Sequence, residues 1–263
     1  PQFGYALNTS GFAKIQGKIF FDQDGDTNYN TGEGISGMNL ELWVKNGTVY
    51  SKVDSTTYTT NPSSAIGAYE ISGIADAKTY QLRITEQASK DKLVGYVEVK
   101  GLVSGDLYKS IDITTASNLA TQDIGYKGNT ATGKARDLTV YARQDTNGNE
   151  KYDTTDGKSQ GVSIQVSSIK RGINLNTVST SATGQVLFTA LPYSDDYVIQ
   201  ASKVGWTPVY DNAHNPAAGA SGQITFNLQD LAGSIVAVTP FFGFKGSPTP
   251  GSDTLAGFVV ANT

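Results

Sequence analysis

Hydrophobic and polar residues alternate along many short stretches of this chain. Tyr80, Leu82 and Ile84 are separated by single polar residues, and residues 162–166 repeat the pattern further on. A period of two places such side chains on one face of a β-strand. Turn-forming Gly, Asn, Asp and Pro separate the stretches at intervals of roughly 8 to 12 residues, which is typical of an antiparallel sandwich. We therefore predict an all-β fold of Ig-like β-sandwich type.

The pattern occurs twice along the chain. Residues 67–74 align with 184–191 at an offset of 117, and residues 123–128 align with 241–246 at an offset of 118. A repeat of this length indicates two homologous domains in tandem. The predicted organisation is a strand-like extension (1–12), a first sandwich (13–127), a short linker (128–133), a second sandwich (134–246) and a C-terminal linker with a strand-like tail (247–263).

A loop rich in oxygen-bearing side chains follows the first predicted strand of each copy, at an offset of 123. Such side chains stand at loop positions 1, 3, 5, 9 and 12, and position 7 can lend its backbone carbonyl. This spacing lets one loop surround Ca²⁺ with roughly six to eight oxygens. The predicted ligands are Asp22, Asp24, Asp26, Asn28, Asn30 and Glu33 in the first loop, and Asp145, Asn147, Asn149, Lys151, Asp153 and Asp156 in the second.

The residues around each loop refine this prediction. Strand-like segments flank the first loop, so the site is not an EF-hand and the metal would join two strands. Four carboxylates in the first loop would repel one another without a cation, whereas the second loop has three, so we expect weaker binding there. Position 6, usually glycine, is Thr27, and we expect Gly25 to make the turn instead. The alternative is an acidic surface turn that binds no ion.

These motifs resemble the B-repeats of serine-aspartate repeat adhesins, which belong to the collagen-adhesin B-type, prealbumin-like β-sandwich superfamily. The resemblance rests on the Asp-x-Asp-x-Asp loop, Gly-Ile-Ser-Gly-Met at 34–38, Gly-x-Tyr-x-Ile at 67–71 and the closing Ile-Gly-Tyr at 124–126. The second copy departs from it, with Asn147 and Asn149 in place of aspartates. The resemblance implies a calcium-binding stalk module that stiffens a surface protein.

Composition narrows the classes of function. A net charge of -4 provides no basic surface for nucleic acid or an anionic membrane, and no apolar run approaches the ~20 residues of a membrane helix. The absence of cysteine excludes disulfides. Calcium loops suit the extracellular space, so we expect a cell-surface protein. No catalytic motif accompanies the single histidine, His214, so we expect no enzyme.

Both ends of the chain resemble strands of the repeat. Phe3-Gly4-Tyr5 is similar to the closing strand at 124–126, and residues 255–262 are similar to the opening strand at 15–22. Two interpretations fit: an excerpt of a longer tandem array, or a subunit whose terminal strand inserts into a neighbour to build a head-to-tail filament. The expected partners are neighbouring copies or adjacent repeat domains, and the leading hypothesis is a non-enzymatic structural building block of a stalk, fibre or filament.

The alternative hypothesis is an adhesin or carbohydrate-binding module with a host or glycan ligand. Trp43 and Trp206 are candidates for a sugar-stacking surface, although such rings more often pack in a core. Lys18, Glu86 and Asn118 are candidates for an isopeptide crosslink of the kind found in related B-type domains. We do not favour the crosslink, because Lys and Glu are rarely buried unless paired.

Overall fold

The structure is a computed structural model that describes residues 11–54, 56–61, 65–116, 118–211, 221–228 and 240–246. Strands account for 52% of the described residues and helix for 3%, which confirms the all-β prediction. No helix among these residues has the length and apolar character needed to cross a membrane. His214, Phe3-Gly4-Tyr5 and the tail at 255–262 lie outside the described residues.

Two sheets face each other in the first sandwich. One contains, in order, β5 (Ala68–Ala75), β1 (Phe12–Phe21), β10 (Ile124–Gly128) and β7 (Tyr96–Lys100), with β9 (Leu119–Thr121) also paired to β1. The other contains β3 (Val49–Lys52), β2 (Asn39–Asn46), β6 (Thr79–Arg83) and β8 (Ile113–Thr114), with β4 (Tyr58–Thr59) paired to β2. A short helix, α1 (Gln87–Lys92), lies in the connection between β6 and β7.

The second sandwich repeats this arrangement. One sheet contains β12 (Gly157–Lys158), β11 (Ala135–Gln144), β20 (Phe241–Gly246) and β18 (Trp206–Asp211), with β16 (Gln185–Pro192) also paired to β11. The other contains β14 (Ile173–Asn174), β13 (Ser163–Ser168), β17 (Tyr197–Ser202) and β19 (Gln223–Phe226), with β15 (Val178–Ser179) paired to β13.

Alternation along the strands forms the core, as the sequence pattern indicates. Ile15 and Ile19 on β1 and Leu40 and Leu42 on β2 are all at most 1% exposed. Burial of each such side chain contributes roughly 1.5 to 3 kcal/mol.

The pattern is typical of antiparallel strands, but each sandwich also contains a parallel pair of strands. The first and last strands of each copy run parallel, with Ile19 opposite Ile124 in one sandwich and Tyr141 opposite Phe241 in the other. Parallel neighbours need a long crossover between them. The chain meets this need because it crosses to the second sheet and back before the last strand is added.

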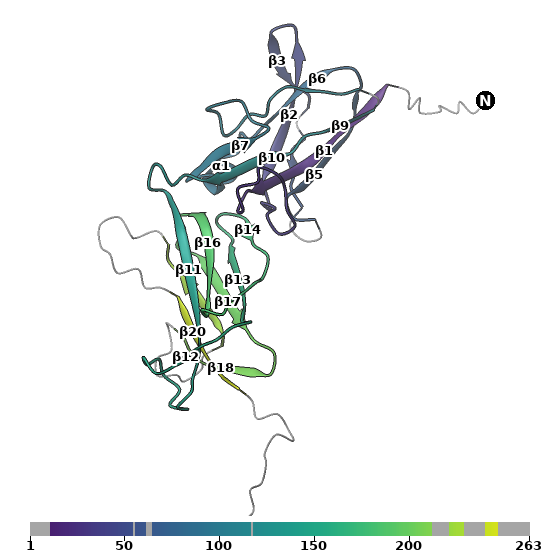
Figure 1. Cartoon of the computed structure of the whole chain (residues 1–263). Helices are drawn as coiled ribbons and strands as arrows, with labels where there is room; N and C mark the ends of the chain where they lie inside the picture. Colours follow the sequence, from purple (N-terminus) through teal and green to yellow (C-terminus); the bar gives the residue numbers. More distant parts are fainter. Residues whose placement is uncertain are drawn as a thin grey trace, which may run out of the picture.

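The two sandwiches lie end to end (Figure 1). A short turn joins β10 to β11, where the Asn129 N–H donates to the Gly95 carbonyl at 2.7 Å. Further contacts connect the two bodies: the Ser36 N–H donates to the Gly172 carbonyl at 3.0 Å, and Arg171 Nη1 donates to the Asp91 carbonyl at 2.9 Å. We call this set of contacts the joint.

Candidate metal loops and the domain joint

The first loop (residues 22–33) begins where β1 ends. The Asp22 N–H donates to the Tyr126 carbonyl at 2.7 Å, and the Phe21 N–H donates to the Glu33 carbonyl at 2.8 Å, so both ends of the loop are fixed to strands. Asp22 and Glu33, at loop positions 1 and 12, are only 4% and 6% exposed. One carboxylate oxygen from each of Asp22, Asp24 and Glu33 lies within 4.8 Å of the others.

Backbone amides hold the first loop in a tight coil. Oδ1 of Asp22, Asp24 and Asp26 accepts the N–H three, two and two residues further on, at 2.8, 3.1 and 2.7 Å. Glu33 closes the coil by accepting the N–H groups of Gln23 at 2.9 Å and Asn30 at 2.8 Å. Hydrogen bonds to the carboxylates therefore shape the coil.

Asparagine side chains complete the first loop. Asn30 Nδ2 donates to Asp24 Oδ2 at 2.8 Å and to Asp26 Oδ2 at 3.1 Å. Asn28 accepts from Lys100 Nζ at 2.9 Å. The Asn30 amide thus lies against the carboxylates of Asp24 and Asp26.

The turn of each loop uses two residues with positive φ. In the first loop these are Gly25 (81°) and Thr27 (65°), and in the second Gly148 (73°) and Glu150 (59°). Gly25 makes part of the turn, as expected, but Thr27 at position 6 is itself left-handed. A non-glycine residue in this region carries a steric cost.

Two carboxyl groups of the first loop have pKa values shifted in opposite directions, upward for Glu33 and downward for Asp26. Burial raises the pKa of Glu33, and the nearby Asp24 and Asp22 carboxylates raise it further. The Asn28 N–H and the Asn30 amide lower the pKa of Asp26. Burial thus makes the charged form of Glu33 less favourable than it is in water, although the Asn30 and Gln23 N–H groups oppose this effect.

The second loop (residues 145–156) repeats the geometry. Asp145 Oδ1 accepts the Gly148 N–H at 2.8 Å, and Asp153 Oδ2 accepts from the side-chain amides of Asn147 at 2.6 Å and Asn149 at 2.9 Å. The Lys151 N–H donates to Asn149 Oδ1 at 3.1 Å. The two loops differ in one respect: among the described residues, a group of three carboxylates close enough to share a metal ion is found in the first loop and not in the second.

Position 12 of the second loop is an incompletely satisfied carboxylate. Asp156 is 6% exposed, and its Oδ1 has no hydrogen-bond partner among the described residues. The Tyr210 hydroxyl donates to Oδ2, and burial raises the pKa of Tyr210, so this hydroxyl keeps its proton. A buried carboxylate oxygen without a donor is costly unless something else binds it.

One pair of residues was missed from the sequence: Tyr29 and Tyr152, at position 8 of each loop. Tyr29 packs edge-on against Phe20 with ring centroids 6.2 Å apart, and Tyr152 packs edge-on against Tyr210 at 6.3 Å. Phe20 and Tyr210 in turn cover Gly125 and Gly243, where a Cβ would collide with the ring. These stacks press each loop onto its sheet. The detectable signal was a tyrosine repeated at the offset of the loops.

The first loop also forms part of the joint. Thr189 Oγ1 donates to the Gln23 carbonyl at 2.7 Å, and Asn176 Nδ2 donates to the Thr31 carbonyl. Gly32 lies so close to Asn176 that a Cβ there would collide with the amide. The back of the first loop is thus held by the second sandwich, while the second loop lies at the far end of the second sandwich.

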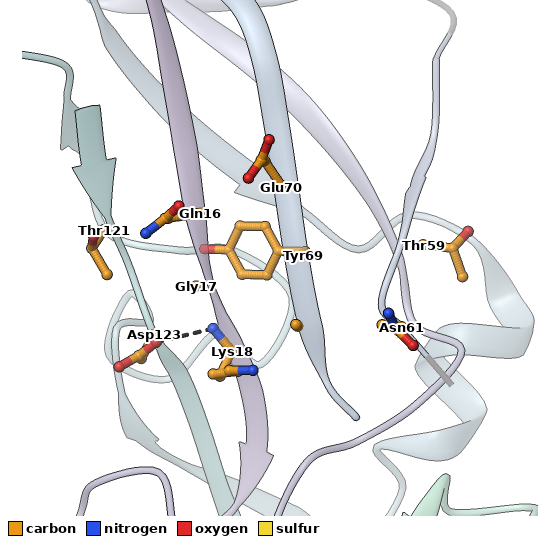
Figure 2. Close-up of a pocket in the computed structure, with 10 residues that line it drawn as sticks. Gln16, Gly17, Lys18, Thr59, Asn61, Tyr69, Glu70, Thr121 and Asp123 are labelled. Atoms are coloured by element: carbon orange, nitrogen blue, oxygen red, sulfur yellow. Dashed lines mark hydrogen bonds between the residues drawn. The ribbon is translucent and has the colours of Figure 1, made fainter. Parts of the chain in front are cut away.

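A hollow of about 800 Å³ lies on the first sandwich. Figure 2 shows Lys18 on β1 beside Asp123, which lies between β9 and β10, with the Tyr69 ring lying across β1 at Gly17. Asp123 Oδ1 accepts the Lys18 N–H at 2.9 Å. Tyr69 is 4% exposed and its hydroxyl donates to the Gln122 carbonyl, so its ring offers no open face for a sugar.

The other candidates from the sequence are not gathered into a site. Each candidate tryptophan already has a cation over its ring: Arg83 lies 4.2 Å from Trp43 and Lys203 lies 4.1 Å from Trp206. For the crosslink, Lys18 Nζ lies 5.1 Å from the Tyr29 ring centroid, whereas Glu86 and Asn118 are exposed. The three crosslink candidates do not form a buried group.

Comparisons with known proteins add the following. No protein-family model matches the chain, and no curated protein sequence matches it. Similar solved structures include a streptococcal ancillary pilin (12% identity, 92% of this chain and 64% of that chain, TM-score 0.31). A fimbrial protein from Bacteroides ovatus is 10% identical (82% and 45%, TM-score 0.27), and a shaft pilin from Lactobacillus rhamnosus GG is 11% identical (90% and 100%, TM-score 0.28).

The chain spans less than two thirds of the streptococcal and Bacteroides structures. At TM-scores of 0.27 to 0.31 these similarities do not assign the chain to the family of any of these proteins.

Proposed function

We propose that this protein is a non-enzymatic, extracellular building block of a cell-surface stalk, fibre or filament, in which Ca²⁺ stiffens two tandem β-sandwiches. The observation that carries the proposal is the burial of the carboxylates at positions 1 and 12 of both loops, which are 4 to 7% exposed. None of the ion pairs between described residues includes Asp22, Glu33, Asp145 or Asp156. Buried carboxylates are paired or bind metals.

The donor sets fit a hard cation. Asp22, Asp24, Asp26, Asn30 and Glu33 would provide oxygens in the first loop, with the carbonyl of Asn28. In the second loop the corresponding residues are Asp145, Asn147, Asn149, Asp153 and Asp156, with the carbonyl of Lys151. When bound, Ca²⁺ would neutralise the repulsion between these carboxylates and hold the coil closed.

The location of the first loop connects metal binding to mechanics. Its backbone carbonyls at Gln23 and Thr31 accept hydrogen bonds from the second sandwich. A loop of fixed shape keeps both acceptors in place, so a filled first loop would stiffen the joint. An empty loop with mutually repelling carboxylates would leave these acceptors less well positioned.

Calcium titration calorimetry and thermal unfolding test the proposal. We expect two sites, a rise in Tm with calcium and a fall in chelator, since a ligand at about 100 times its Kd adds roughly 2.7 kcal/mol to the free energy of unfolding. Asp22→Ala should remove one site and Asp145→Ala the other, whereas Glu70→Gln, on the surface of β5, should remove neither. An unchanged Tm and no binding heat would contradict the proposal.

Donor-strand insertion by a terminal segment is the finer part of the proposal, and it is tested separately. Deletion of residues 254–263 should abolish filaments if this tail is the donor strand, while leaving calcium binding unchanged. Filaments of normal length from the deleted chain, seen by electron microscopy, would contradict strand donation by this tail.

A further inference from the structure

The first sandwich has a hollow of about 310 Å³ at the end that faces away from the joint. We call this end the leading pole. Val44, Val53, Ile74 and Tyr58 line the hollow together with Ser72. Val53 is 40% exposed, so apolar surface is open to solvent here.

The same surface exists in the second sandwich, where its role is visible. Tyr80 donates its hydroxyl to the Ala75 carbonyl at 2.8 Å, and Tyr197 donates to the Pro192 carbonyl at 2.7 Å. Both pairs are related by the offset of 117. Both sheets also carry a bulge at the same place, after Ala13 in one and after Arg136 in the other. The two ends are therefore equivalent in backbone structure.

In the second sandwich this surface is the one held by the joint. Thr189, the counterpart of Ser72, donates to the Gln23 carbonyl at 2.7 Å. Ala190 has a φ of 49° and its counterpart Gly73 a φ of 75°, and the Ala190 carbonyl packs directly against Gly128. The leading pole thus has the form of a receiving surface that the chain itself uses once.

The complementary surface lies at the far end of the second sandwich, which we call the trailing pole. Residues of the first sandwich that reach across the joint include Gln23, Thr31 and Ser36. Their counterparts by the repeat are Thr146, Thr154 and Gln160, all exposed on or beside the second loop. Each chain therefore has a leading pole that resembles the second-sandwich side of the joint and a trailing pole that resembles the first-sandwich side.

We propose that the leading pole of one copy of this chain docks onto the trailing pole of another and reproduces, between chains, the contact that Thr189 makes with the first loop across the joint. This inference rests on the proposed function as a rod-forming block and names the surface by which the blocks meet. An interface that pairs two different poles does not close on itself, so it extends into a linear assembly. In the docked pair the Ser72 hydroxyl would donate to the Thr146 carbonyl, as Thr189 does to Gln23.

Thiol crosslinking tests the docking, because the chain has no native cysteine. The double variant Ser72→Cys with Thr146→Cys, treated with a short bismaleimide, should give a ladder of covalent multimers. Within one chain these positions lie at opposite poles, so the ladder arises only between copies. Gln23→Cys with Thr189→Cys is the positive control and should link within one chain.

The matched negative control keeps Ser72→Cys and moves the second thiol to Leu187→Cys, which is 53% exposed on a side face of the second sandwich. Val53→Lys in the hollow should reduce the ladder several-fold, and Val103→Lys, at a comparably exposed site elsewhere, should not. Equal multimer yields from the 72/146 and 72/187 pairs, while the positive control links, would overturn the docking inference.

The crosslinking experiment and the calcium experiment can fail independently of each other. Calcium-dependent melting is a property of single chains, so it can persist when the ladder is absent, and then only the docking inference is wrong. A ladder without any effect of calcium on Tm would instead contradict the proposed function. The ladder should survive deletion of residues 254–263, because docking between poles needs no donated strand.

Discussion

Glu33 is the buried carboxylate at position 12 of the first loop. Burial raises the pKa of its carboxyl, and the proposed function makes this carboxylate a calcium ligand. We expect Glu33→Gln to lower Tm strongly in calcium and much less in chelator, measured by scanning calorimetry. Glu70→Gln, 54% exposed in a surface ion pair, should give small, equal changes in both. Equal losses for Glu33→Gln in both conditions would contradict its role as a ligand.

Thr27 pays a conformational cost at position 6, with φ at 65°. Substitution of Thr27 by glycine removes this steric cost. At Thr154, an exposed turn residue of ordinary φ, glycine relieves no strain and only increases the conformational entropy of the unfolded chain. We expect the free energy of unfolding of Thr27→Gly to exceed that of Thr154→Gly by about 1 to 2 kcal/mol, as measured by urea denaturation. The reverse order would show that Thr27 is not strained.

The sequence predicted that each loop brings its oxygen-bearing side chains together, because oxygen spacing along a single loop is a local property. Tyr29 and Tyr152 could not be assigned in the same way, since their partners Phe20 and Tyr210 come from different strands in the two copies. The position of the tyrosine repeats, whereas the ring beneath it does not. An alignment of the two halves pairs residues of equivalent strands, so it cannot show that rings from two different strands fill the same place.

Among the elements, the turn between β13 and β14 depends on one carboxylate. Asp196 accepts hydroxyl groups from Ser168 and Ser194 and the Lys170 N–H at 2.8 Å. Burial alone would raise the pKa of Asp196, but these hydrogen bonds outweigh it and the pKa is lowered. The turn then presents Arg171 to the first sandwich.

A lowered pKa means that Asp196 stabilises the fold above its unfolded value of about 4 and that this contribution is lost as the pH falls below that value. Asp196→Asn should cost about 1 kcal/mol at pH 7, allowing for partial exposure, and distinctly less near pH 3, below the unfolded pKa. Calorimetry at both pH values measures this difference. The neighbouring exposed Asp195→Asn should show little change at either pH, and a pH-independent loss for Asp196→Asn would contradict this account.

The alternation of hydrophobic and polar residues predicted where strands lie, but it did not predict the helix α1 or the parallel pairing of the first and last strands. The helix α1 has no counterpart in the second copy, where the connection from β17 to β18 is only a few residues long, so the repeat gave no signal for it. The parallel pairing of first and last strands depends on the path between the sheets. That path is a property of the whole sandwich and not of any strand.

For the whole molecule, the decisive fact is that the first loop lies in the joint. Sequence could not choose between the two ends of the sandwich, because that choice depends on contacts such as Thr189 with Gln23 across 166 residues of chain. The structure therefore gives two loops of similar sequence different surroundings. One loop supports the joint, and the other lies at the exposed trailing pole.

The distance between the two sandwiches tests the central claim most directly. Spin labels at Glu70→Cys and Leu187→Cys, one exposed site on each sandwich, report this distance by pulsed electron paramagnetic resonance. We expect a narrow distribution in calcium that broadens in chelator, and a broad one in calcium when Asp22→Asn or Thr189→Val is added. Asp145→Asn, in the loop away from the joint, should leave the distribution narrow. A distribution of the same width in calcium, in chelator and in all three variants would contradict a joint stiffened by calcium.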